Sequence, residues 1–256
     1  MRGELVLSIA TLLGFLLTLV RVASVFVFVP IPGMGAAVHP ARVMLALGVT
    51  VALYPQWPQV TAEPTVGMFV MWVVLEAALG IGIGLTVAFM IEAFAVAAQI
   101  MGLQAGYAFA STIDPNTQAD SSVLVVFAQL AAGLLFFATG MDREVLRIFA
   151  RSLETYPAGS YVLSRAAAEQ VLSLGYTMFA SGLRLALPMV AVLVMVDISL
   201  ALLGRVNSQL QLLTIAFPVK MMVGLAMLGW LALMFPAVLR MNSGPSFAAA
   251  RGLIAH

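Results

Sequence analysis

The sequence contains no cysteine and few charged residues, and both shortages limit what the protein can be. Without cysteine there are no disulfides, no thiolate metal ligands and no cysteine nucleophile. Only 9% of the 256 residues are charged and 62% are hydrophobic, whereas a soluble domain has about 25% charged residues. The formal net charge of +1 gives no support for nucleic-acid binding. The composition predicts an integral membrane protein whose apolar surface is covered by lipid or by partner subunits.

Residues that could carry catalysis are also scarce. The only histidines are His39 and His256, and the HExxH, GxSxG and Walker-type glycine motifs are missing. A serine–histidine pair could form only with His39, which lies in a proline-flanked hinge and is more typical of a turn or interface residue. We therefore expect no enzyme activity, no metal site and no cofactor.

Apolar runs dominate the chain and predict an all-α fold. Residues 5–29 are too long for the apolar core of a cleaved signal peptide and predict a retained first membrane helix. Residues 66–110 exceed the length of one crossing, so we expect them to bend back on themselves. Beyond the final run, residues 240–256 are predicted to form a flexible tail. The other runs are 43–54, which is short for a crossing, 123–139, 171–203 and 212–239.

Charged and small residues interrupt these runs. Arg21 lies near the end of the first run, and we expect it to snorkel to the membrane interface. A charge at a helix centre costs about 2.5–3.5 kcal/mol, so such residues should pair with each other, face a wet cavity or meet a partner subunit. Asp197 could form a structural pair with Arg205 or Lys220. Gly80 and Gly84 have the spacing of a close helix contact. The charges within or beside apolar runs are Glu76, Glu92, Arg184, Asp197, Arg205 and Lys220.

An amphipathic connector is predicted within residues 142–170. Arg143, Arg147 and Arg151 recur every four residues, and apolar residues occupy the other face. Such a helix presents its basic face to water or to lipid headgroups. Counting positive charges places this connector on the cytoplasmic side of the membrane.

The stretch between residues 102 and 122 has a different composition from its neighbours. It reads GLQAGYAFASTIDPNTQADSS and separates two apolar runs. Asp114-Pro115 stops a helix, because proline lacks an N–H and restricts the residue before it. Unpaired backbone groups cannot face lipid. The stretch must therefore lie in water, in a pore or against another protein, and we interpret it as lining or closing a passage.

Four segments together resemble the FliR family of flagellar and type III secretion export-gate proteins. They are residues 21–55, with an arginine and spaced prolines, residues 98–115, ending in Asp-Pro, residues 183–188, reading LRLALP, and residues 205–224, containing Phe-Pro-Val-Lys. The resemblance implies a single membrane domain over residues 1–256, made of bent helical hairpins. It also implies that FliP-like and FliQ-like subunits join this chain in a helical assembly around a channel for unfolded substrates, next to an FlhB-like switch subunit.

The resemblance also assigns roles to individual residues. It implies a plug that closes the pore. A contact with other subunits is predicted at the polar turn of residues 204–211 and the residues after it, because this turn joins two charged apolar segments. The predicted plug residues are Gly106, Tyr107, Phe109, Ser111, Asp114, Pro115, Asn116, Gln118 and Ser122. The predicted assembly residues are Arg205, Gln209, Gln211, Pro218 and Lys220.

The resulting prediction is a core subunit of a type III protein-export gate in the bacterial inner membrane, at a flagellar or injectisome basal body. The alternative is a proton-coupled secondary transporter for a small solute, with broken helices and Asp197 as its proton-carrying carboxylate. Dependence on companion subunits distinguishes the first function from the second.

Overall fold

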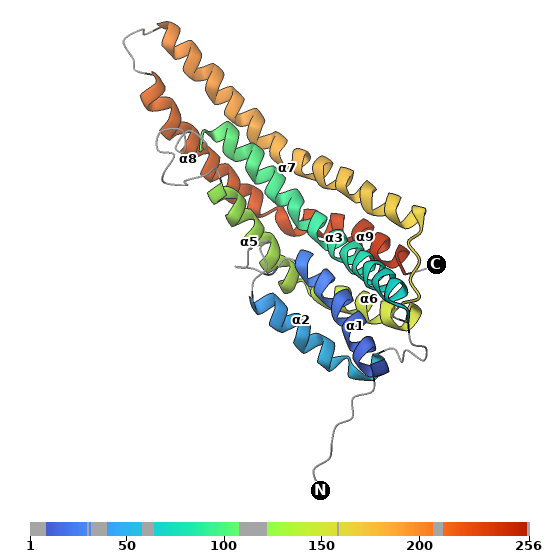
Figure 1. The fold of residues 1–256 in the computed structure, drawn as a ribbon. Coiled ribbons are helices and arrows are strands. Elements are labelled where there is room, and N and C mark those ends of the chain that lie inside the picture. Colours follow the sequence, from blue (N-terminus) through green and yellow to red (C-terminus); the bar gives the residue numbers. More distant parts are fainter. Residues whose placement is uncertain are drawn as a thin grey trace. The chain divides into compact units, whose positions relative to one another are not determined.

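The computed structural model describes residues 9–29, 31, 40–57, 64–107, 122–157, 159–206 and 212–254. All regular structure in these ranges is helical (Figure 1). In chain order the helices are α1 (Ile9–Phe28), α2 (Pro40–Ala52), the short 3-10 helix η1 (Tyr54–Gln56), α3 (Val66–Ala105), α5 (Ser122–Ala138), α6 (Met141–Thr155), α7 (Arg165–Val206), α8 (Leu212–Ala232) and α9 (Phe235–Gly252).

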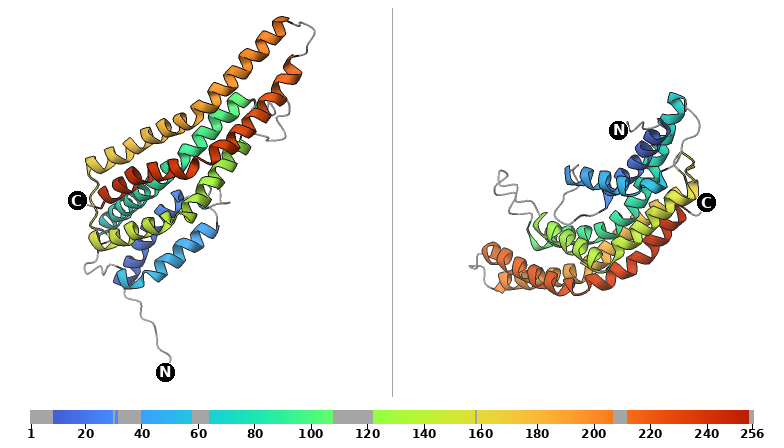
Figure 2. Two further views of the ribbon diagram at one scale, coloured as in Figure 1. Left: turned by 180° about the vertical axis from the view of Figure 1, so that it is seen from behind. Right: turned by 90° about the horizontal axis from the view of Figure 1, so that it is seen from below.

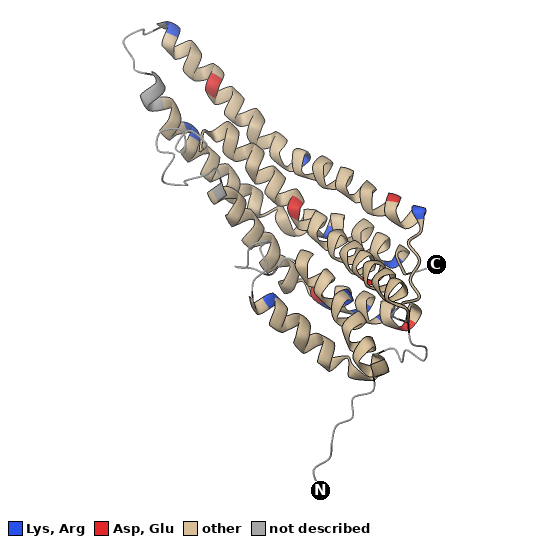
Figure 3. Ribbon diagram, viewed as in Figure 1, with Lys and Arg blue, Asp and Glu red and all other residues tan. Residues whose placement is uncertain are grey.

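Several of these helices have the length and composition of membrane spans. Helices α1, α3 and α7 are each long and apolar enough to cross a membrane. The pairs α5–α6 and α8–α9 are each separated by a short break, and they raise the number to as many as five if each pair counts as one span. Charged residues are sparse along the helices (Figure 3). The all-α membrane protein predicted from the sequence is confirmed.

Packing divides the chain into two compact units. Unit 1 contains Met1–Phe89, Phe137–Leu174 and Gly244–His256, and unit 2 contains Met90–Phe136 and Gly175–Ser243. Helices α3, α5, α7 and α9 therefore each contribute residues to both units. The single domain predicted from the sequence stays a prediction.

In unit 1, α1 and α2 lie side by side (Figure 2). Pro40 starts α2, where its missing N–H costs no helix hydrogen bond. Two positions later, the guanidinium of Arg42 donates from Nη1 to the carbonyls of Phe26, at 2.6 Å, and Val27, at 2.7 Å. These carbonyls belong to the last turn of α1. No later residue of the helix supplies an N–H group to bond them. Arg42 thus caps the end of one helix from the start of the next.

Helices α1 and α3 approach closely in the same unit. A Cβ added to Gly80 would lie 2.5 Å from the carbonyl oxygen of Arg21, and one added to Gly84 would lie 2.9 Å from that of Val25. Only glycine leaves room for the two backbones at this separation. The close helix contact predicted from the Gly80–Gly84 spacing is confirmed.

In unit 2, the C-terminal part of α3 packs against α7 and α9. Gly182 of α7 lies so close to α3 that an added Cβ would be 2.9 Å from the carbonyl oxygen of Ala93. The ring of Phe94 contacts that of Phe235 on α9, with centroids 4.7 Å apart. These contacts bury the centre of unit 2 between helices far apart in the sequence.

Two of the apolar runs form helices that differ from the simplest expectation. The predicted bend in the run of residues 66–110 is wrong for its described part, because α3 continues unbroken for 40 residues, about twice what one crossing needs. It contains no proline, and Gly80 and Gly84 pack against α1 without ending it. The apolar run of residues 212–239 is not one continuous helix, although α8 and α9 together can still count as one span. It breaks at residues 233–234, and α8 and α9 meet there at a bend of 57°.

The prediction of a flexible tail over residues 240–256 is also wrong for residues 240–254, where the described part of the chain ends. Helix α9 extends to Gly252, with Pro245 inside it. In unit 1, Phe247, Ala250, Leu253 and Ile254 are buried, and Leu253 lies against Gly82 of α3. Burial of these side chains outweighs the helix-breaking composition of Asn-Ser-Gly-Pro at residues 242–245.

Candidate functional site

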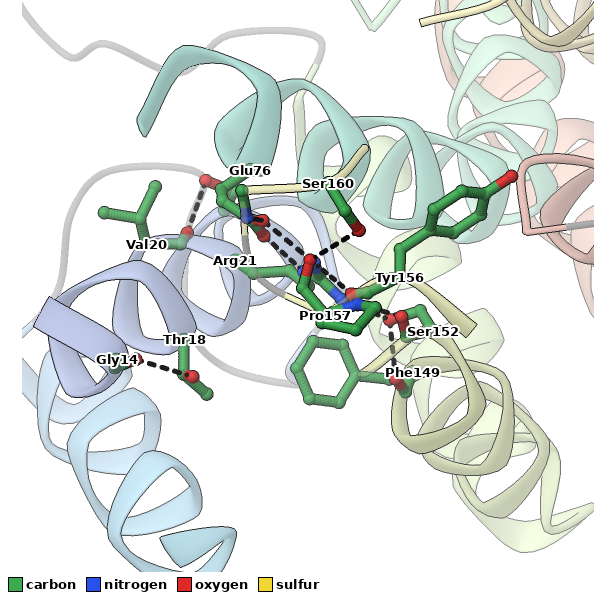
Figure 4. Close-up of polar contacts among 12 residues, drawn as sticks. Gly14, Thr18, Val20, Arg21, Glu76, Phe149, Ser152, Tyr156, Pro157 and Ser160 are labelled. Carbon is green, nitrogen blue, oxygen red and sulfur yellow. Dashed lines mark hydrogen bonds and ion pairs between the residues drawn. The ribbon is translucent and has the colours of Figure 1, made fainter. Parts of the chain in front are cut away.

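Unit 1 contains a buried ion pair between α1 and α3. Neither the side chain of Arg21 nor that of Glu76 is exposed to solvent. The guanidinium donates from Nε to Oε2 and from Nη2 to Oε1, the latter at 2.9 Å (Figure 4). Such a two-point contact uses the planar fork of arginine and is among the strongest pairings available to a carboxylate. The pair fixes how α1 and α3 meet.

The same guanidinium also holds the end of α6. Its Nη1 donates to the carbonyl of Ser152 at 2.8 Å, and its Nη2 donates to the carbonyl of Tyr156 at 2.9 Å (Figure 4). The Ser152 carbonyl also accepts from the backbone N–H of Tyr156, and the C-terminal end of a helix carries a partial negative charge, so a cation is favourable there. Arg21 therefore joins three segments, α1, α3 and the C-terminal end of α6.

The connection between α6 and α7 is attached to the other side of the pair. The backbone N–H of Gly159 donates to Oε1 of Glu76 at 2.8 Å. Gly159 has a φ of +89°, and an added Cβ would lie 2.9 Å from the ring of Trp72. Glycine is therefore required twice, by the backbone conformation and by the ring. Glu76 uses this N–H as an additional partner that stabilises its charge.

These contacts correct one prediction and explain another. Arg21 does not snorkel to the interface, because it is fully buried and its partners lie inside unit 1. Glu76 does pair with another charge, as predicted for charges in apolar runs. Its partner lies 55 residues away, and nothing in the sequence pattern identifies it. The sequence offers one indication of this pairing: one apolar helix carries a positive charge and another carries a negative charge.

Unit 2 contains a second polar cluster, between α3, α7 and α8. Asp197 of α7 accepts hydrogen bonds from Lys220 of α8 at 3.0 Å and from Gln104 of α3 at 3.3 Å. The Lys220 side chain is 16% exposed and that of Asp197 is 43% exposed. The predicted pairing of Asp197 with Lys220 is confirmed. Helices α7 and α8 lie side by side here (Figures 1 and 2).

Comparison with known proteins identifies the family. A sequence model described as "Bacterial export proteins, family 1" matches residues 12–243. This chain belongs to that family of bacterial export proteins. The match extends over both polar clusters and over all the helices except the first residues of α1 and the last of α9.

Individual relatives of this export protein all have one name. The Flagellar biosynthetic protein FliR of Escherichia coli (strain K12) is 29% identical over 211 residues, covering 82% of this chain and 80% of the relative. The protein of the same name from Pectobacterium carotovorum subsp. carotovorum is 30% identical over 198 residues, covering 76% of each chain. That from Buchnera aphidicola subsp. Acyrthosiphon pisum (strain APS) is 25% identical over 226 residues, covering 88% of each.

Three of the predicted plug residues of this export protein, Gly106, Tyr107 and Ser122, lie among the described residues. Gly106 follows the end of α3 with a φ of +87° and lies next to the ring of Phe217. The Tyr107 hydroxyl donates to the carbonyl of Met221 on α8 at 3.3 Å. Ser122 begins α5. The other predicted plug residues, Phe109, Ser111, Asp114, Pro115, Asn116 and Gln118, lie outside the described residues.

The predicted assembly residues divide in a similar way. Arg205 and Pro218 are exposed, whereas Lys220 is engaged with Asp197. Gln209 and Gln211 lie outside the described residues. Their roles in assembly stay predictions.

The remaining intramembrane charges differ from each other. Glu92 of α3 accepts a hydrogen bond from Gln129 of α5 at 3.1 Å. Arg184 of α7 is exposed, and no described residue forms an ion pair or side-chain hydrogen bond with it. Within the described part of the chain, no three His, Asp or Glu side chains come together as a metal site would require.

Proposed function

We propose that this export protein is a core subunit of the flagellar protein-export gate in the bacterial inner membrane. In this proposal FliP-like and FliQ-like subunits complete a channel with it, an FlhB-like switch subunit lies beside them, and unfolded substrates pass through. Membership of the bacterial export family supports transport of protein, and the relatives named for flagellar biosynthesis support the flagellar system.

The observation that carries the proposed channel is the polar stretch between α3 and α5. Both helices are strongly apolar, yet the 16 residues between them include two aspartates, an asparagine, a glutamine and a proline. Backbone of this kind is compatible with membrane depth only where it lines water or contacts protein. Tyr107 attaches the start of the stretch to α8, through the carbonyl of Met221. We therefore propose that residues 106–122 form a plug anchored at this end.

The transporter alternative has less support. Its central group would be the carboxylate of Asp197, which would have to bind and release protons during transport. In this chain that carboxylate is already bonded to Lys220 and Gln104. The contacts give Asp197 a structural role in joining α3, α7 and α8.

Deleting residues 111–113 from the plug tests the channel function. The deletion is made in cells that produce the chain together with the FliP-like and FliQ-like subunits, and leakage of potassium and small dyes is measured. We expect leakage to rise. The matched control is the same deletion in cells that lack the partner subunits, where no channel forms and leakage should stay at the background level.

Two outcomes would contradict the proposal. Unchanged leakage in the presence of the partners would argue against the plug. Solute uptake by the purified chain alone, reconstituted into vesicles under a proton gradient, would favour the transporter instead.

A further inference from the structure

Helix α3 ends in a defined backbone turn in unit 2. The backbone N–H of Gly106 donates to the carbonyl of Leu103 at 3.2 Å, and that of Tyr107 donates to the carbonyl of Gly102 at 3.0 Å. These two bonds, together with a glycine at a φ of +87°, form the Schellman motif that ends many helices. The chain therefore leaves α3 in a defined direction at residue 107.

One face of α8 lies against this turn. An added Cβ on Gly106 would lie 3.1 Å from the ring of Phe217, and one on Gly224 would lie 3.0 Å from the Cβ of Ala105. The absence of side chains at these two glycines lets the end of α3 approach α8 closely. The residues of α8 on this face recur at intervals of three and four, and they are Phe217, Lys220, Met221 and Gly224.

Two side-chain hydrogen bonds attach the same end of α3 to α7 and α8. Gln104 donates from Nε2 to Oδ2 of Asp197 at 3.3 Å, and that oxygen also accepts from Nζ of Lys220 at 3.0 Å. The hydroxyl of Tyr107 donates to the carbonyl of Met221 at 3.3 Å. The two attached residues lie immediately before and after the glycine turn. We call these five residues the exit clamp.

We propose that the exit clamp holds the proposed plug, residues 106–122, in the position that closes the pore, with Gln104, Tyr107 and Asp197 as positioning residues. This inference rests on the proposed function, since without a plug the clamp would only pack three helices together. A segment that closes a pore needs fixed ends, and the clamp fixes the end at α3 through a carboxylate on α7 and a carbonyl on α8. Its loss should release that end.

The first experiment measures leakage of potassium and small dyes from cells that produce the chain with the FliP-like and FliQ-like subunits. The variants are Gln104→Ala, Tyr107→Phe and the double variant, and the deletion of residues 111–113 is the positive reference. Gln99→Ala is the matched control for the glutamine, because Gln99 is an exposed glutamine of the same helix. Tyr176→Phe is the control for the tyrosine, because Tyr176 of α7 is 79% exposed.

Leakage should rise with each clamp bond that is removed. Loss of one bond should increase the population with a released end about fivefold, and loss of both should increase it up to about 30-fold. Leakage of the double variant should therefore exceed that of either single variant and be limited by the level of the deletion. The two control variants should leak no more than the wild type.

The second experiment follows the clamp in the purified chain without partners. Because the sequence has no cysteine, Leu103→Cys and Met222→Cys place the only two spin labels on α3 and α8. Both positions are well exposed, at 57% and 70%. The distances between the labels should be narrowly distributed in the wild type and in both controls. The distribution should broaden in Gln104→Ala/Tyr107→Phe, while the helix content measured by circular dichroism stays unchanged.

The outcomes separate this inference from the proposed function. If the deletion leaks and the double variant does not, the clamp does not position the plug and the inference is wrong, whether or not the label distances broaden. A lower thermal midpoint without leakage has the same meaning, because it shows a contribution to stability alone. If the deletion does not leak either, the proposed function fails as well. A double variant that loses helix content is replaced by Tyr107→Phe, which removes a single oxygen atom and must leak by itself.

Discussion

Arg21 on α1 and Glu76 on α3 form a fully buried, two-point ion pair that also holds the C-terminal end of α6. The pair is a structural centre of unit 1, because the same two side chains bind backbone groups at Ser152, Tyr156 and Gly159. Its loss should therefore affect both the packing of α1 on α3 and the connection between α6 and α7.

Arg21→Leu should destabilise the chain strongly. Removing one partner leaves the Glu76 charge buried without compensation, which costs about 3–5 kcal/mol. The measurements are the thermal midpoint in detergent and the rate of proteolysis between α6 and α7, which should rise. Arg21→Lys should also lose stability, since lysine cannot reproduce the fork that reaches Glu76, Ser152 and Tyr156 together.

The double variant Arg21→Leu/Glu76→Leu provides the control for this prediction. With both charges gone, part of the stability should return, although Gly159 and the end of α6 lose their side-chain partners. If Arg21→Leu alone is as stable as the wild type, the pair does not hold unit 1 together.

Gly80→Ala should weaken the contact between α1 and α3. Its new Cβ would lie 2.5 Å from the carbonyl oxygen of Arg21 and 2.7 Å from the Cβ of Ser24, so the helices must move apart. We expect a loss of about 1–3 kcal/mol in the free energy of unfolding. Gly48→Ala in α2 is the matched control. No atom lies within 4 Å of its added Cβ, and the higher helix propensity of alanine should raise stability by up to about 1 kcal/mol. Equal effects of the two substitutions would contradict the close contact.

The features predicted from sequence are those encoded by local spacing. Gly80 and Gly84 lie one helical turn apart, and their common face follows from that interval alone. Asp197 and Lys220 lie on consecutive helices joined by a short connection, so the chain brings them together. The amphipathic helix α6 also follows from periodicity, because its buried residues Val145, Phe149 and Ser152 recur at intervals of three and four.

The features that sequence reasoning missed depend on tertiary packing. Arg21 binds a carboxylate 55 residues away and two backbone carbonyls more than 130 residues away, and no motif marks a carbonyl as a partner. The helical tail is a second feature that depends on tertiary packing. The side-chain oxygen of Asn242 accepts a hydrogen bond from the hydroxyl of Ser181 on α7 at 3.1 Å, and not from a local turn. Most of the predicted plug lies outside the described residues, so its assignment still depends on the family resemblance and on its composition.

A double-mutant cycle on Asp197 and Lys220 should show coupling between α7 and α8. Their side chains are 43% and 16% exposed, so solvent screening limits the interaction, and we expect a coupling free energy of up to about 1 kcal/mol. The cycle compares Asp197→Asn, Lys220→Gln and the double variant by their unfolding free energies in detergent. The measured coupling should shrink at high salt. Additive effects of the two substitutions would mean that the ion pair does not join the helices.

Tyr161→Phe should preserve stability at neutral pH and increase it, relative to the wild type, in alkaline solution. The Tyr161 side chain is almost fully buried, and its hydroxyl has no hydrogen-bond partner among the described residues. Burial raises the pKa of Tyr161 and the neighbouring Tyr156 raises it further, while Arg21 lowers it. Removing an unsatisfied buried hydroxyl costs nothing, and at neutral pH we expect a change between zero and a gain of about 1 kcal/mol.

The alkaline effect follows from the direction of that pKa shift. Because the folded chain keeps Tyr161 protonated to a higher pH than the unfolded chain, the stability linked to this group is complete below the ordinary tyrosine pKa of about 10. This stability is lost as the pH rises from about 10 through the pKa that Tyr161 has in the folded chain. Thermal midpoints measured from pH 8 to pH 11 should therefore fall more steeply for the wild type than for Tyr161→Phe. Parallel curves, or a large loss of stability in the variant at neutral pH, would mean that the hydroxyl has a partner in the folded protein.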